Sequence, residues 1–313
     1  MSKPVATVLT SPKARRRRHE YRVLGGSFVG TVFVHIVLVI VGLVMLLPFV
    51  HELAKSLSFP LRVQVGDVVF WPKDFTFRNY TYFIDPAYKN LWRSFINTAY
   101  LTVVGTVWSV FFTAIVAFPL SRPRSEFRLG PAMMGLVVFS IIFFPPLIPY
   151  FLVVKSYGLM DTLWAIILAH TIGPFNLILV FSYYRGLPED LFDSCRIDGG
   201  TDLRLVWQIA IPLSKPVLAT IAVYTAVLLW NIFLHALLFI RDPTIMPLQP
   251  IVRSILSRST DSLARQSLTF NPFESAESTK SAIILLSTLP IIAVYPFLQR
   301  YFVKGALLGA LKS

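Results

Sequence analysis

The residues of this sequence best suited to chemistry with a soluble partner lie between positions 193 and 212. They interrupt an otherwise apolar chain with carboxylates, a guanidinium and a thiol, and comprise Asp193, Ser194, Cys195, Arg196, Asp198, Gly199, Ile209 and Pro212. A catalytic nucleophile needs a base within reach and a metal needs clustered ligands, whereas the only cysteine here has no nearby histidine. The charges therefore suit docking to a protein better than catalysis.

Local signals around this stretch predict two short helices. Pro188 suits a first helical turn, and the acidic residues after it are favoured there by the helix dipole. Gly199-Gly200 ends the first helix, Thr201 can cap the second through its hydroxyl, and Pro212 ends the second. The two helices would hold the polar residues in a fixed arrangement.

The first predicted helix has two faces. Leu191, Phe192 and Cys195 share one face, which leaves Asp193, Arg196 and Asp198 for other contacts. For Asp193 the alternative to a partner contact is interaction with the dipole of its own helix. As the single cysteine of the chain, Cys195 cannot form an internal disulfide. We expect it to be a small packed residue instead of a redox group.

The spacing of these residues resembles the EAA loop of ABC-importer permeases. That motif orders Glu-Ala-Ala, three residues, Gly, nine residues, Ile, one residue, Leu and Pro. In this chain the corresponding positions are 193–195, Gly199, Ile209, Ile211 and Pro212, so every spacing is kept. Asp replaces Glu, and Ser-Cys replaces Ala-Ala.

Neighbouring segments are similar to the carbohydrate-uptake branch of these permeases, the MalG-like group, nearest the LplC type and the smaller permease of bacterial alginate importers. They are Arg-Ile-Asp-Gly at 196–199, Ile-Pro-Leu-Ser-Lys-Pro at 211–216 and Phe-Thr-x-x-Asn-Tyr at 75–80. The resemblance implies a MetI/MalG-like fold, a homologous partner permease and two ABC ATPase subunits that bind ATP and magnesium. It also implies a periplasmic or lipid-anchored substrate-binding protein.

The composition indicates an all-α membrane protein. Hydrophobic residues make up 55% of the chain and charged residues only 14%, which is rare for a soluble domain. A membrane-spanning helix needs about 20 apolar residues. Six runs without Asp, Glu, Lys or Arg meet this length, near 29–50, 95–120, 131–154, 162–184, 216–239 and 281–299.

The distribution of basic residues orients these spans. Arg15 to Arg18 and Arg22 precede the first span, so we expect both termini in the cytoplasm of a bacterial inner membrane. This topology gives a basic tail at 1–28, a permease domain at 29–300 and a cytoplasmic tail at 301–313. The coupling loop is then 185–215, and the outside loops are 51–94, with extended structure expected after Pro60, and 240–280.

The net charge of +13 raises the possibility of a nucleic-acid partner. The basic residues are, however, spread through loops without a folded soluble domain to present them. We expect anionic lipid headgroups of the membrane, and no nucleic acid, to be their partner.

The chain lacks a P-loop and a His-Glu-x-x-His motif, so we expect no catalytic residue, cofactor or metal of its own. ATP would be hydrolysed by separate subunits. An ion-coupled secondary carrier is the alternative, although such carriers usually hold acidic or basic residues inside their spans. The polar exceptions in the apolar runs are His35, His170, Asn176, Asn231 and His235.

Four residues are candidates for contact with a translocated sugar. Sugar hydroxyls need paired donors and acceptors and sugar rings stack on aromatic faces, which favours Asn176, Tyr224, Trp230 and Asn231. Packing is the alternative role for Trp230, and an interhelical hydrogen bond that for Asn231. We therefore predict the permease subunit of a binding-protein-dependent ABC importer for a sugar or oligosaccharide, with acidic, neutral and non-sugar solutes left open.

Overall fold

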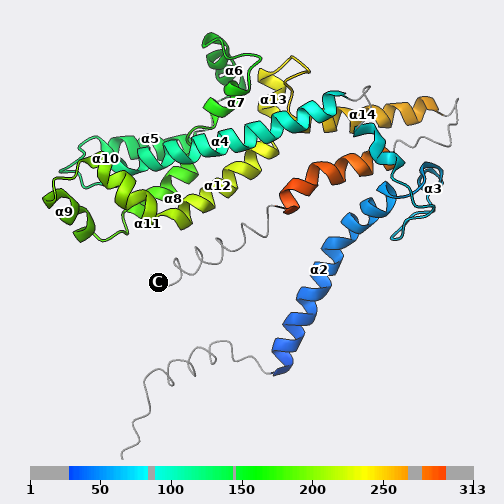
Figure 1. Ribbon diagram of the computed structural model, residues 1–313, viewed down its shortest axis with the longest axis horizontal. Coiled ribbons are helices and arrows are strands. Elements are labelled where there is room, and N and C mark those ends of the chain that lie inside the picture. The colour runs from blue at the N-terminus through cyan, green and yellow to red at the C-terminus, as the bar shows by residue number, and fades with distance from the viewer. Residues whose placement is uncertain (1–27, 84–88, 144–145, 267–276, 294–313) are drawn as a thin grey trace, which may run out of the picture. The chain divides into compact units, whose positions relative to one another are not determined.

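The computed structural model describes residues 28–83, 89–143, 146–266 and 277–293, and every regular element in these ranges is helical (Figure 1). The prediction of an all-α chain is thus confirmed for the described residues. The chain divides into two compact units, residues 1–51 and 52–313.

The described part of the first unit belongs to one long helix, α2 (Phe28–Ser56), which extends a few residues into the second unit. Its stretch from Gly30 to Ser56 has a mean hydropathy of 2.9. Side chains from 31 to 50 are exposed on all sides of this helix within the chain. A helix that is apolar all round is stable only in an apolar surrounding, as a membrane provides.

The segment after α2 contains two short helical pieces joined by turns and bends, where the sequence indicated extended structure. Pro60 begins a short helix, α3 (Pro60–Gln64), because proline suits a first helical turn. A 3₁₀ turn, η1 (Arg78–Phe83), follows. The buried Asn79 donates hydrogen bonds from Nδ2 to the carbonyls of Ser56 (2.8 Å) and Ser58 (2.9 Å), which fastens the loop to the end of α2.

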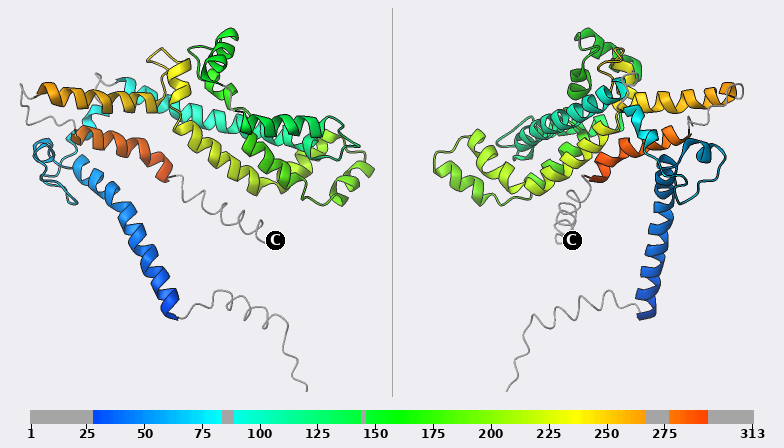
Figure 2. Two further views of the ribbon diagram at one scale, coloured as in Figure 1. Left: turned by 180° about the vertical axis from the view of Figure 1, so that it is seen from behind. Right: turned by 45° about the vertical axis from the view of Figure 1, so that its right-hand side comes forward.

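Three helices form the bundle of the second unit, α4 (Lys89–Ser121), α8 (Pro174–Tyr184) and α12 (Lys215–Trp230) (Figure 2). α4 packs along both of the others. At Gly105 the approach is close, because a Cβ there would lie 2.5 Å from Cδ1 of the buried Leu229. Small residues let membrane helices approach in this way.

Three of the predicted spans are broken into shorter helices. The stretch 131–154 contains α5 (Gly130–Ile142) and α6 (Leu147–Ser156). The stretch 162–184 contains α7 (Leu163–Ala169) and α8, bent by 45° where Pro174 starts the second piece. The stretch 216–239 contains α12 and α13 (Leu234–Phe239).

By length and composition, the described residues hold two helices able to cross a membrane, or four when each bent pair counts as one. α14 (Leu248–Gln266) follows α13, and a last helix runs from 277 to 293. Residues 294–299 of the sixth predicted span, and both predicted tails except Phe28, lie outside the described residues. The number of spans therefore stays a prediction.

Candidate functional site

The loop at 185–215 contains the first predicted helix as α9 (Asp190–Ile197). It begins two residues after Pro188, so that proline precedes the helix instead of occupying its first turn. Asp190 and Asp193 lie in the first turn and Arg196 in the last. Both signs of charge therefore match the helix dipole.

Gly199 ends α9 in the left-handed conformation, with φ of +75°. The N–H of Gly200 donates to the carbonyl of Cys195 (2.8 Å), and that of Gly199 to the carbonyl of Arg196 (2.9 Å). This is the hydrogen-bond pattern of a Schellman-type helix end. A Cβ on Gly200 would lie 2.7 Å from the Cys195 carbonyl oxygen, so this second glycine is required by crowding.

The second predicted helix is composed of α10 (Asp202–Leu205), the π-helical turn η3 (Val206–Ala210) and α11 (Ile211–Leu213). Thr201 is at the N-cap position, but its hydroxyl makes no capping hydrogen bond there. Pro212 lies in the first turn of α11, where its missing N–H is tolerated. The helix ends one residue past this proline, at Leu213. The chain then bends by 79° into α12.

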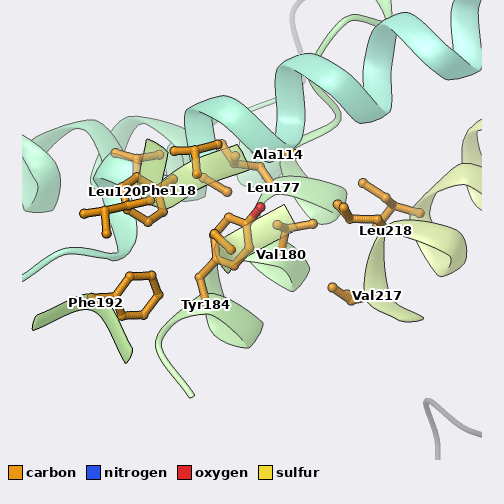
Figure 3. Packing of buried hydrophobic residues seen from close by; sticks show 14 residues of the cluster. Ala114, Phe118, Leu120, Leu177, Val180, Tyr184, Phe192, Val217 and Leu218 are labelled. Carbon is orange, nitrogen blue, oxygen red and sulfur yellow. The ribbon is translucent and has the colours of Figure 1, made fainter. Parts of the chain in front are cut away.

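The inner face of the loop packs against the bundle, at the end of the bundle where α9 and α10 lie in Figure 1. Phe192 is 1% exposed, and its ring centroid lies 5.9 Å from that of Phe118 on α4. Figure 3 shows Phe192 beside Tyr184 of α8, below Phe118 and Leu120. Leu205 and Ala210 are also fully buried in this cluster. The inner face of the loop is thus part of the core.

The predicted face of α9 is only partly correct. Cys195 is partly buried and packs on the cluster, which agrees with its expected packing role. Leu191 is 42% exposed, because the side of α9 that contacts the bundle is centred on Phe192. Ile209 also packs on the cluster as a partly buried residue.

The charges of α9 are used within the chain as well as outward. The Arg196 guanidinium donates two hydrogen bonds to the Glu126 carboxylate in the turn between α4 and α5, one of 3.0 Å. This hydrogen-bonded pair raises the pKa of Arg196. Arg196 also lies 3.5 Å from Asp193, whose side chain remains 64% exposed. Ser194 bonds the carbonyl of Asp190, and Asp198 is exposed beyond the last turn of α9.

The outer face of the loop presents apolar residues that the sequence reasoning missed. Ile197 is 86% exposed and Leu203 is 65% exposed. An available signal was their type and place: Ile197 is an apolar residue five positions after Phe192, hence on a different face of the same helix. Exposed apolar side chains between acidic residues are typical of a surface that a partner protein covers.

The four candidate path residues occupy different surroundings. Asn176 donates a hydrogen bond to the Thr225 hydroxyl (3.1 Å), which joins α8 to α12. Tyr224 is 45% exposed and makes an edge contact with Phe175. Asn231 is exposed at the end of α12 and bonds the carbonyl of Val227 (2.8 Å).

Trp230 is placed differently from these three. It is 7% exposed, and its indole donates to the carbonyl of Ser287 (3.0 Å). It therefore packs within the chain. The structure also brings together two histidines of the predicted spans, His170 and His235, with ring centroids 4.9 Å apart.

Residues 109–307 match the family described as "Binding-protein-dependent transport system inner membrane component". The chain is 41% identical over 274 residues to Protein LplC of Bacillus subtilis (strain 168), covering 87% of this chain and 91% of that protein. It is 37% identical to the polygalacturonan/rhamnogalacturonan transport system permease protein YtcP of the same organism, covering 88% and 96%.

A solved structure is similar in fold as well as sequence. It is a chain in the crystal structure of a bacterial ABC transporter involved in the import of the acidic polysaccharide alginate. The TM-score is 0.79 at 30% identity, over 95% of this chain and all of that one. The match thus includes the bundle and its loop.

Proposed function

Because the chain belongs to the family of binding-protein-dependent transport system inner membrane components, we propose that it forms a translocation path for a sugar or oligosaccharide together with a homologous permease. Two ABC ATPase subunits would hold ATP and magnesium and drive the cycle. A substrate-binding protein would deliver the sugar on the outside. In this family the subunit is a non-catalytic membrane component.

One observation carries the coupling part of this proposal: the 185–215 loop is packed into the bundle on one side and exposes apolar residues on the other. Phe192 anchors the loop, and Ile197 and Leu203 offer the apolar outer surface. A displacement of that outer surface would reach α4, α8 and α12 through a packed core, which resists deformation. Asp193, Ser194 and Asp198 surround the surface with groups for polar contacts to an ATPase.

The proposed topology has six spans with both termini in the cytoplasm of a bacterial inner membrane. It is supported by the basic residues before α2 and by the apolar helices described above. Breaks in the third, fourth and fifth spans free backbone carbonyls. Such breaks are tolerated where neighbouring helices or a wet cavity receive the carbonyls, and in this proposal they line the path.

The proposed substrate is an acidic oligosaccharide. Two of the similar proteins are named for acidic glycans, alginate and polygalacturonan. Asn176, Tyr224 and Asn231 would line the path. The deciding measurement is ATP hydrolysis by the reconstituted complex with its binding protein, given an oligouronate or the neutral glycan of equal length. Stronger stimulation by the neutral glycan would refute the acidic assignment.

Replacing the outer apolar residue of α9 by a charge tests the coupling proposal. Ile197→Asp should release the ATPase subunits during purification and abolish uptake, whereas Ile197→Leu keeps an apolar side chain and should retain both. Normal uptake by Ile197→Asp would refute the proposed docking surface. Uptake that continues without ATP and collapses with an ionophore would instead identify a secondary carrier.

A further inference from the structure

A cavity of about 400 Å³ lies beside the coupling loop. It is bounded by the end of α4, the start of α5 and the end of α8, together with the residues that lead into α9. Leu120, Met134 and Phe181 form apolar parts of its wall. The cavity is therefore amphipathic and lies where three helix ends meet.

The polar part of the wall carries surplus positive charge. Arg122, Arg124 and Arg185 line the cavity, and among the described residues Glu189 is the one acidic residue of its lining. Within the described part of the chain, none of these three guanidinium groups forms an ion pair. The nearby carboxylate of Glu126 is engaged by Arg196.

Two of the lining residues have a buried polar atom without a hydrogen-bond partner among the described residues: Arg122 at Nε and Tyr184 at its hydroxyl. The Arg122 guanidinium is held in place by two aromatic rings, at 4.1 Å from the centroid of Phe192 and 4.8 Å from that of Phe118. Burial lowers the pKa of Arg122. A partly desolvated cation without an ion-pair partner gains most from an anion.

We propose that this cavity binds a phosphate group, supplied either by the headgroup of an anionic lipid or by free inorganic phosphate. The three arginines favour a phosphate group as the ligand, because one guanidinium can donate two parallel hydrogen bonds to phosphate oxygens. The apolar wall would accommodate the glycerol and first acyl carbons of a lipid. Its place at the cytoplasmic headgroup level rests on the proposed topology, and basic pockets between helices there suit anionic headgroups.

The test measures lipid retention directly, independently of transport. The intact importer complex is purified in mixed micelles of phosphatidylglycerol and phosphatidylcholine with identical acyl chains, and bound lipid is counted by native mass spectrometry. Arg124→Gln and Arg185→Gln should each weaken phosphatidylglycerol retention about fivefold, the loss expected for one arginine near an anionic headgroup. Arg128→Gln removes the same charge from the same turn outside the cavity wall and should leave retention unchanged.

A second arm separates the two phosphate sources. Inorganic phosphate is titrated into the complex in phosphatidylcholine alone, with the same variants. Preferential phosphatidylglycerol retention identifies the lipid headgroup, whereas saturable phosphate binding with the same variant pattern and no lipid preference identifies the free anion.

Either of two results would overturn the proposal. One is equal retention of both lipids by all variants, with no phosphate binding. The other is loss of the ATPase subunits in Arg124→Gln and Arg185→Gln without a change in bound lipid or phosphate, which would assign these arginines to subunit docking.

Discussion

Arg196 of α9 donates two hydrogen bonds to the carboxylate of Glu126, which lies seventy residues earlier in the turn between α4 and α5. Both side chains are about one-third exposed. The pair therefore connects α9 to the turn between α4 and α5, in addition to the contact that Phe192 makes with the bundle. Exposed ion pairs contribute little to stability, so we assign this one to holding α9 in position.

A double-mutant cycle tests that role. Glu126→Gln and Arg196→Gln should each lower the free energy of unfolding by about 1 kcal/mol or less, because solvent screens the pair. Each should reduce the amount of sugar imported per ATP, measured in proteoliposomes, since α9 can then pivot. If the two residues act as a pair, the double variant is no worse than either single variant. Additive losses would contradict this.

The left-handed conformation of Gly199 gives a matched pair of substitutions. Asn tolerates positive φ, whereas a β-branched residue is strained there by about 1–2 kcal/mol. No atom of the described residues lies within 4 Å of a Cβ built at this position, so crowding by them does not confuse the comparison. Gly199→Asn should retain most uptake and Gly199→Val should lose it. Equal uptake by the two variants would show that the helix end does not matter.

Phe192 should act as the anchor of the coupling loop. Phe192→Ala removes a buried aromatic side chain, a change that costs about 3–5 kcal/mol in a core. We expect uptake to fall while ATP hydrolysis persists, because the loop is no longer fixed to the bundle. Leu191→Ala, on a more exposed neighbour, is the control. Retained uptake in Phe192→Ala, with normal assembly, would argue against the anchor.

Asp161 connects two loops at the other end of the bundle. It has a left-handed φ of 57°, and its carboxylate accepts hydrogen bonds from the backbone N–H groups of Arg241 and Asp242. Asp161→Asn keeps an acceptor oxygen and tolerates positive φ, whereas Asp161→Val loses both. We expect only the Val variant to lower the melting temperature of the complex, through a loss of about 1–3 kcal/mol. The same melting temperature in both variants would refute the connection.

The candidate path residues differ in burial: Tyr224 and Asn231 are exposed, whereas Trp230 is buried. Combined Tyr224→Ala and Asn231→Val substitutions should reduce uptake more than basal ATP hydrolysis, because both side chains are exposed within the chain. Trp230→Ala should instead lower stability by about 3–5 kcal/mol, since its indole is packed and hydrogen-bonded. Thermal melting and uptake assays on the purified complex distinguish these outcomes. Equal loss of uptake and hydrolysis in the double variant would indicate damage to the fold.

The sequence by itself determined the helical class and the existence of the coupling loop. Long apolar runs allow only helices to satisfy their backbone in a membrane, and glycine at 199 indicates a helix end through its conformational freedom alone. Both are local properties. The same local reasoning placed Pro188 and Pro212 near helix ends, within two residues of the bounds in the structure.

Only the tertiary structure decided which residue of each pattern does what. Leu191 and Phe192 are adjacent apolar residues on one short helix, and the position of α9 on the bundle buries the second and exposes the first. Glu126 and Arg196 come together because the turn after α4 and the loop after α8 meet at one end of the bundle. Such pairings depend on how distant helices pack, which hydrophobic periodicity within any one segment does not encode.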